Sequence, residues 1–154
     1  MEKSCDERLR EQFFPDEILT YSLEYAQLKK QKVLERKTIL LFSEQYPEQY
    51  PCGMKNINFF WGRFHITRKG KLLVFASLHG KDENNNTVAE NYLISLDSTG
   101  NIVDKKIVNF EKPFTLFHTA SIRNGSFPSD IIHIYGHITN PDNEMWYGRI
   151  EIKD

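Results

Sequence analysis

Histidine is the residue type in this chain with the widest chemical range, because its ring exchanges a proton near neutral pH and binds metals. All five histidines fall in segments that the sequence predicts as strands. In residues 131–138, alternation puts the histidines on one face and the isoleucines at 132 and 134 on the other. We predict a polar face made by His65, His118, His133 and His137. The register of neighbouring strands decides whether these rings meet, so half-buried rings with local hydrogen bonds are the alternative interpretation.

A metal site formed by these histidines is not expected. His133 and His137 are four residues apart. On a strand that spacing separates them by about 13 Å, which is too far for two ligands of one zinc ion. No carboxylate or cysteine lies in the same segments. We therefore predict neither a metal site nor a cofactor.

Two short motifs contain a histidine followed by a hydroxyl residue. Residues 65–67 are His-Ile-Thr, and residues 118–120 are His-Thr-Ala. The first resembles one half of the signature of the two-histidine phosphoesterases, which use two H-x-T/S motifs on facing strands to act on a cyclic or diester phosphate. The second has no hydroxyl at its third position, and the helices of that fold have no counterpart here. This resemblance assigns no catalytic role.

A loop in the middle of the chain imitates the start of a calcium site. Asp82, Asn84 and Asn86 have the required spacing, but the sixth position is Thr87 instead of glycine and the twelfth is Leu93 instead of glutamate. The bidentate ligand of a calcium loop is therefore missing. The segment is better explained as a solvated hairpin loop, and no phosphate-binding glycine loop or G-x-S-x-G motif occurs elsewhere.

Large apolar side chains gather in two clusters, residues 59–61 and 145–147. Adjacent strand residues face opposite ways, so at least one large ring in each cluster is expected to point away from the core. Exposed aromatic rings are frequent anchors of binding surfaces. The aromatic binding candidates are Trp61, Tyr135, Trp146 and Tyr147.

The charges of the chain nearly balance, with 20 basic and 21 acidic residues and a net charge of -1. Such a chain has no strong long-range field to attract a phosphate backbone, so nucleic-acid binding is not expected. The distribution is uneven, because acidic residues crowd the start and basic residues follow between Lys29 and Lys37. We predict that this segment steers an acidic partner, with Lys29, Lys30 and Lys32 as binding residues.

Most of these residues lie in strands that the sequence predicts from about residue 57 onward. Alternation and turn residues predict strands near 57–67, 71–79, 88–96, 102–110, 114–123, 131–138 and 146–152. Glycine supplies a positive φ in the connections at 68–71 and 97–101. No helical stretch long enough for a parallel crossover separates the strands, so the predicted topology is an antiparallel meander.

The segment before these strands has another pattern. In residues 16–36, apolar side chains recur at spacings of three and four, which is typical of an amphipathic helix. The apolar run at 38–42 suits a buried strand, and the prolines in 46–53 predict a loop. We predict a helical, charged segment with a linker in residues 1–56, packed on an antiparallel β domain in residues 57–154.

Two parts of the β domain, about 64–97 and 117–152, follow one plan of strand, turn, strand, polar loop and a further strand. Units of this size resemble the blades of a β-propeller. A propeller needs at least about four blades, so two units cannot close one. The predicted fold class is mainly β with one N-terminal amphipathic helix: a curved sheet, β-sandwich or incomplete barrel, or alternatively propeller-blade-like repeats that several chains assemble into a ring.

The cellular setting follows from three features. Cys5 and Cys52 have no C-x-x-C spacing, the N-terminus is charged without an apolar signal core, and no stretch approaches the length of a bilayer span. We expect a cytoplasmic protein with no membrane contact.

The sequence favours a non-enzymatic protein-binding domain with a single protein partner, for example an inhibitor or immunity-type protein that neutralises a cognate partner. This hypothesis follows from the small size, the lack of a catalytic signature and the uneven charge. The alternative is a carbohydrate- or small-ligand-binding or hydrolytic domain related to sugar-active propellers, with Trp61, Tyr135 or Trp146 stacked on a sugar ring. The oligomeric state stays open.

Overall fold

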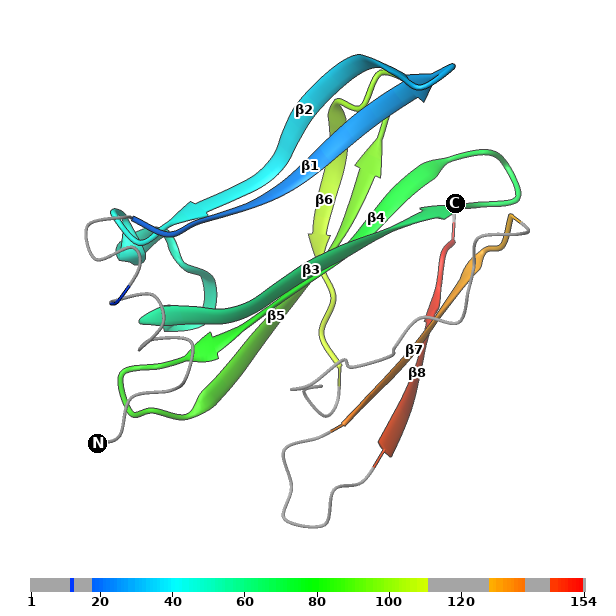
Figure 1. Cartoon of the computed structure of the whole chain (residues 1–154). Helices are drawn as coiled ribbons and strands as arrows, with labels where there is room; N and C mark the ends of the chain where they lie inside the picture. Colours follow the sequence, from blue (N-terminus) through cyan, green and yellow to red (C-terminus); the bar gives the residue numbers. More distant parts are fainter. Residues whose placement is uncertain (1–11, 13–17, 111–127, 138–144, 154) are drawn as a thin grey trace.

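A four-stranded antiparallel sheet lies between two β-hairpins in the computed structural model, which describes residues 12, 18–110, 128–137 and 145–153 (Figure 1). The central sheet has the order β3-β4-β5-β6, with β3 at Asn56–Ile66, β4 at Leu72–Lys81, β5 at Thr87–Leu96 and β6 at Ile102–Ile107. The first hairpin consists of β1 (Thr20–Lys29) and β2 (Lys32–Ser43). The second consists of β7 (Ile131–His137) and β8 (Met145–Glu151).

The prediction of a mainly β, antiparallel chain is confirmed. Six of the predicted strands correspond to β3 through β8, and the apolar run at 38–42 lies within β2. The strand predicted at 114–123 lies outside the described residues. The prolines at 46–53 produce two short 3-10 turns, Pro47–Gln49 and Pro51–Gly53.

Strand β4 is buried on both of its faces. Each residue from Leu73 to Gly80 is buried, because β4 lies between β3 and β5 and the two hairpins cover opposite sides of the sheet. Its near-continuous apolar sequence suits that position.

The β1–β2 hairpin covers one face of the central sheet. Val74, Ala76 and Leu78 of β4 point toward it and share a core with Ile39 and Leu40 of β2. The core continues across β5 through Tyr92, Ile94 and Leu96. The hairpin therefore contributes apolar residues to the larger of the two cores.

The β7–β8 hairpin covers the other face. Phe75 of β4 packs there with Ile132 and Ile134 of β7. Around them are the partly buried Trp61, Leu93, Val108, Phe110, Tyr135, Trp146, Ile150 and Ile152. Residues 128–130 hold the start of β7 at the end of β3, because Ser129 donates its backbone N–H to Ile66 and Asp130 accepts that of Arg68.

The helix predicted within 16–36 is wrong for the described part of that range, which forms β1 and the start of β2. A spacing of four is an even number, so Tyr21 and Tyr25 share a face on a strand as they would on a helix. The sequence also lacks the usual mark of a tight hairpin turn here. Lys30 and Gln31 both adopt a positive φ, where glycine or asparagine is the common residue. The spacing of these apolar residues is therefore compatible with a helix and with a strand.

The three turns within the central sheet, at residues 67–71, 82–86 and 97–101, share one hydrogen-bond pattern. In each, the first and fifth residues pair through the backbone and the fourth donates its N–H to the first. The fourth position has a positive φ in every case, at Gly70, Asn85 and Gly100. The predicted tight connections at 68–71 and 97–101 are thus confirmed, with the expected use of glycine.

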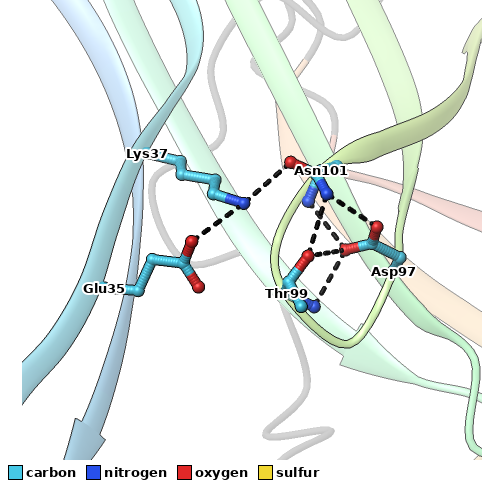
Figure 2. A network of polar contacts seen from close by, with 5 residues as sticks. All are labelled: Glu35, Lys37, Asp97, Thr99 and Asn101. Atoms are coloured by element: carbon cyan, nitrogen blue, oxygen red, sulfur yellow. Dashed lines mark hydrogen bonds and ion pairs between the residues drawn. The ribbon is translucent and has the colours of Figure 1, made fainter.

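A polar network fastens the first hairpin to the last of these turns (Figure 2). Lys37 on β2 donates from Nζ to Asn101 Oδ1 at 2.7 Å and lies 3.0 Å from a carboxylate oxygen of Glu35. Asn101 in turn donates to Asp97 Oδ2 and to Thr99 Oγ1, at 2.8 Å each. The side chain of Lys37 is therefore part of the hairpin's attachment to the sheet.

The expected likeness to propeller blades does not appear in the described residues. β4 and β5 belong to the four-stranded sheet, whereas β7 and β8 form a sheet of their own. Among the residues that the structure describes, no helix is long and apolar enough to cross a membrane.

Candidate functional site

The side of the β7–β8 hairpin that faces away from the central sheet carries aromatic and charged side chains. Cross-strand pairing places Tyr135 opposite Tyr147 and His133 opposite Arg149. Burial alternates along both strands, so Tyr147 and Arg149 are exposed while Ile132, Ile134 and Trp146 face the core. Tyr135 shares the side of Tyr147 but is partly buried and also packs against that core. We call this surface the outer aromatic face; it consists of His133, Tyr135, Met145, Tyr147 and Arg149.

Tyr147 is the centre of the outer aromatic face. Its ring lies 5.1 Å from that of Tyr135 and 5.8 Å from that of His133, the latter at an interplanar angle of 28°. A hydrogen bond of 2.6 Å joins the Tyr147 hydroxyl to His133 Nδ1. Even so, 51% of Tyr147 is accessible to solvent. The ring is thus held by two neighbours while much of its surface is open to a ligand.

Arg149 is the charged member of this face and is paired at the border of the face. Arg149 forms an ion pair with Glu151, two residues along the same strand and on the same face. A guanidinium beside aromatic rings can donate to carboxylate or carbonyl acceptors of a ligand. Tyr and Arg are also the residue types that dominate binding energy at protein interfaces.

Both tryptophans are partly buried and pack against the core that Phe75, Ile132 and Ile134 form. Trp61 packs edge-to-face on Phe75, with ring centroids 5.8 Å apart, and Trp146 packs on the same cluster. In the 145–147 cluster the expected alternation is present, since Trp146 faces inward and Tyr147 outward. The structure thus brings the exposed Tyr147 and the partly buried Tyr135 together and packs Trp61 and Trp146 against the core.

The predicted histidine face is not assembled. His65 is buried on the central sheet, where its Nε2 lies 2.6 Å from the carbonyl oxygen of Ser129, whereas His133 faces away from that sheet. The backbone of His137 is opposite Met145, and His118 lies outside the described residues. Thr67 of the His-Ile-Thr motif is buried as well.

A buried polar cluster on β4 and β5 is not predicted by any pattern in the sequence. Ser77 Oγ lies 2.6 Å from Asn91 Oδ1, to which it donates, and 2.9 Å from His79 Nε2. All three residues are buried. A serine next to a histidine suggests a nucleophile, but here the hydroxyl proton is directed to an amide oxygen and the group is closed to solvent. The cluster therefore serves the internal hydrogen bonding of the sheet.

Cys52 has a thiol that resists ionisation. Its Sγ donates to Glu90 Oε2 at 2.9 Å. Partial burial, together with the hydrogen bond and the negative charge of Glu90, raises the pKa of Cys52 to about 11. Because the thiolate is the reactive form, this environment is the reverse of that of a nucleophilic cysteine.

The imitation of a calcium loop is a hydrogen-bonded turn. Asp82 Oδ1 accepts the backbone N–H groups of Asn84 and Asn86 at 2.9 and 2.8 Å, and Asp82 Oδ2 accepts from the Asn86 side chain. These bonds, first that of the Asn86 side chain, lower the pKa of Asp82. Both carboxylate oxygens of Asp82 therefore accept hydrogen bonds within the turn. Within the described ranges, no group of three or more His, Cys, Asp or Glu residues is arranged to hold a metal ion.

The basic segment from Lys29 to Lys37 is divided between two environments. Lys29, Lys30 and Lys32 are exposed at the tip of the β1–β2 hairpin. Arg36 instead pairs with Glu24, and Lys37 with Glu35 and Asn101. Within this segment, the three lysines at the tip are therefore the basic side chains without a carboxylate partner in the described part of the chain.

No family model, curated protein or solved structure matches the chain.

Proposed function

We propose that this chain is a non-enzymatic protein-binding domain that holds a single protein partner through the outer aromatic face, in the manner of an inhibitor or immunity-type protein. The observation that carries the proposal is the state of Tyr147, which is held by His133 and Tyr135 and yet is half exposed. A ring fixed before binding loses little conformational freedom when a partner covers it.

The neighbours of Tyr147 suit the same role. Met145 is exposed beside it and adds a deformable apolar side chain, and Arg149 adds a donor at the border. A surface with an apolar centre and a charged edge has the organisation of a protein interface. Tyr135 extends the apolar centre across the hairpin.

The lysines at positions 29, 30 and 32 do not belong to this contact. They lie on the hairpin that covers one face of the central sheet, whereas the outer aromatic face belongs to the hairpin on the other (Figure 1). A standard interface covers about 800 Å² on each partner. One compact partner on the outer aromatic face therefore leaves the lysines uncovered.

Affinity capture with the purified chain, followed by titration of the captured partner, tests the proposal. Tyr147→Ala should weaken binding by at least about tenfold, in line with the loss of an aromatic anchor. Tyr46→Ala is the matched control, because Tyr46 is a tyrosine of similar exposure, 46% against 51%, on the far side of the molecule in the β2–β3 connection. It should bind as the wild type does.

Equal binding by the wild type and by folded Tyr147→Ala would remove the outer aromatic face from the proposal. The alternative function is carbohydrate or small-ligand binding, in which a ligand would stack on the rings of Tyr135 and Tyr147. If a sugar raises the melting temperature of the wild type but not of Tyr147→Ala, and no protein is captured, that alternative replaces protein binding.

A further inference from the structure

One end of the molecule combines exposed lysines with exposed apolar side chains. Tyr25 of β1 packs against Phe64 of β3 and against Gly100 of the β5–β6 turn. The tip of the β1–β2 hairpin therefore extends at the same end as the β3–β4 turn at residues 67–71 (Figure 1). We call this region the basic end.

The positive charge of the basic end comes from two turns that are distant in sequence. Lys29, Lys30 and Lys32 are exposed, and none of them forms an ion pair or hydrogen bond with another residue in the described part of the chain. Lys69 and Lys71 are exposed in the second turn. Arg68 of the second turn forms an ion pair with Asp130 and so adds no net charge, which leaves the lysines of the two turns as the source of the positive charge at this end.

Apolar side chains lie between and beside these lysines. Leu28, Val33 and Leu34 at the hairpin tip are 66%, 60% and 56% exposed. Ile66, at the end of β3, is 49% exposed. Leu28 and Val33 are cross-strand partners, so their side chains form one small apolar surface next to the turn.

The tip of the β1–β2 hairpin extends from a part of the hairpin that is packed on the central sheet. Tyr25 is buried against Gly100, and Lys37 is hydrogen-bonded to Asn101, so the middle of the hairpin is attached to the central sheet. The tip begins after this attachment and carries its aliphatic side chains outward. Its exposed leucines and valine are consequently presented at a fixed place.

We propose that the basic end docks on an anionic membrane surface, with Leu28, Val33 and Leu34 entering the interface and the lysines contacting lipid headgroups. A protruding aliphatic tip surrounded by lysines fits a lipid surface, which requires no complementary pocket. Lysine is a compact point charge suited to a diffuse negative surface. The carboxylates of a specific acidic peptide are better matched by the guanidinium of arginine, which can donate two parallel hydrogen bonds to one carboxylate. Docking of this kind needs no membrane-spanning segment, which was the ground on which the sequence excluded membrane contact.

Vesicle flotation of the full chain tests the proposal. The probes are vesicles of phosphatidylcholine alone and vesicles in which about a third of the lipid is phosphatidylglycerol. The chain should float only with the anionic vesicles, and binding should weaken as salt is added. The triple change Lys29→Gln, Lys30→Gln, Lys32→Gln should reduce partitioning on the order of a hundredfold, since each lysine near such a surface contributes about fivefold.

Two further variants separate charge from insertion. Leu28→Ser with Val33→Ser should weaken binding while the salt dependence persists, because the lysines remain. The charge control is Lys55→Gln, Lys105→Gln, Lys106→Gln, which removes three exposed lysines outside the two turns and should leave partitioning within about twofold. Because Lys105 lies over the Tyr92 ring and Lys106 pairs with Asp104, the melting temperature of this variant is measured first. All of these positions are exposed, so the variants should stay folded.

Three outcomes would overturn the proposal. The first is no flotation with anionic vesicles at low salt. The second is an equal loss of vesicle partitioning in the control triple variant and in the Lys29, Lys30, Lys32 triple variant, which would mean that only the total charge of the chain matters. The third is preferential binding to poly-glutamate in a competition with the vesicles, which would assign the basic end to an acidic protein instead of a lipid surface.

Discussion

Tyr25 and Gly100 are in direct contact, and the contact leaves no room for a side chain at position 100. A Cβ atom on Gly100 would lie 2.3 Å from Cδ1 of the Tyr25 ring. Gly100 also has a φ of 81°, in the region that favours glycine. The position therefore requires glycine for its backbone and, separately, for the approach of the first hairpin.

Gly100→Ala should lower the free energy of unfolding by about 3 kcal/mol, because it adds left-handed backbone strain to a steric conflict in a packed core. Urea unfolding followed by tryptophan fluorescence measures this loss. Adding Tyr25→Ala to Gly100→Ala should cost less than the sum of the single changes, since the two residues share one contact.

Gly70→Ala separates the two causes. Gly70 occupies the same place in its turn with a φ of 80°, but nothing lies within 4 Å of its would-be Cβ. This variant should lose only about 1–2 kcal/mol, the backbone contribution alone. An equal loss in both variants would mean that the Tyr25 ring moves aside without cost.

Asp97 makes the stability of the β5–β6 turn depend on pH. The carboxylate accepts hydrogen bonds from Asn101 and Thr99, and these bonds, first that of the Asn101 side chain, hold its pKa well below the ordinary value of 3.8. The stabilisation is therefore complete above pH 3.8 and is lost as the pH falls toward the lowered folded pKa. Asp97→Asn should be less stable than the wild type at pH 7, and this difference should shrink below pH 3.8.

Melting temperatures recorded between neutral and acid pH measure that difference directly. Asp104→Asn is the control, because Asp104 is an exposed carboxylate on β6 that takes no part in a turn. A difference between the wild type and Asp97→Asn that stays constant down to the acid limit would show that the charge of Asp97 does not act through the turn.

Most of the strand pattern could be predicted from the sequence, because alternation and glycine turns are local signals. The turn at 97–101 illustrates this, since the Asp97 side chain accepts hydrogen bonds from the turn and Gly100, which has no Cβ, adopts the positive φ. The β1–β2 hairpin could not be predicted in this way. Its turn places Lys30 and Gln31 at a positive φ, and the pairing of β1 with β2 must compensate this strain.

The candidate site was predictable to a lesser degree. Alternation correctly separated Trp146 from Tyr147, but the sequence contains nothing to say that the core lies on the side of Trp146. The grouping of histidines failed for a similar reason. His65 and His133 belong to different sheets, and the packing of one sheet on another leaves no periodic signal.

Trp146 and Tyr147 should therefore differ in their effect on stability. Trp146→Ala removes a large ring from the second core and should cost about 2–3 kcal/mol. Tyr147→Ala removes an exposed ring with cross-strand contacts and should cost about 1 kcal/mol or less. Urea unfolding of both variants is the measurement, and a larger loss for Tyr147→Ala would reverse the assignment of the two faces.

The Cys52 thiol should react slowly near neutral pH. With its pKa raised to about 11, mainly by burial and further by Glu90, little thiolate is present under those conditions. In a Cys5→Ser chain, the rate of alkylation by iodoacetamide should keep rising with pH well beyond 9.0, the ordinary pKa of a thiol. Glu90→Gln removes the negative charge beside Sγ, so it should lower the pKa and speed the reaction at neutral pH.

Burial and Glu90 contribute in separable ways to this low reactivity. Since desolvation is the larger cause, the pKa in Glu90→Gln should fall yet stay above 9.0. Glu83→Gln removes an exposed carboxylate from the β4–β5 turn and should leave the alkylation profile unchanged. If Glu90→Gln and Glu83→Gln gave the same profile as the parent chain, the hydrogen bond from Cys52 to Glu90 would have no influence on the thiol, and burial alone would account for its low reactivity.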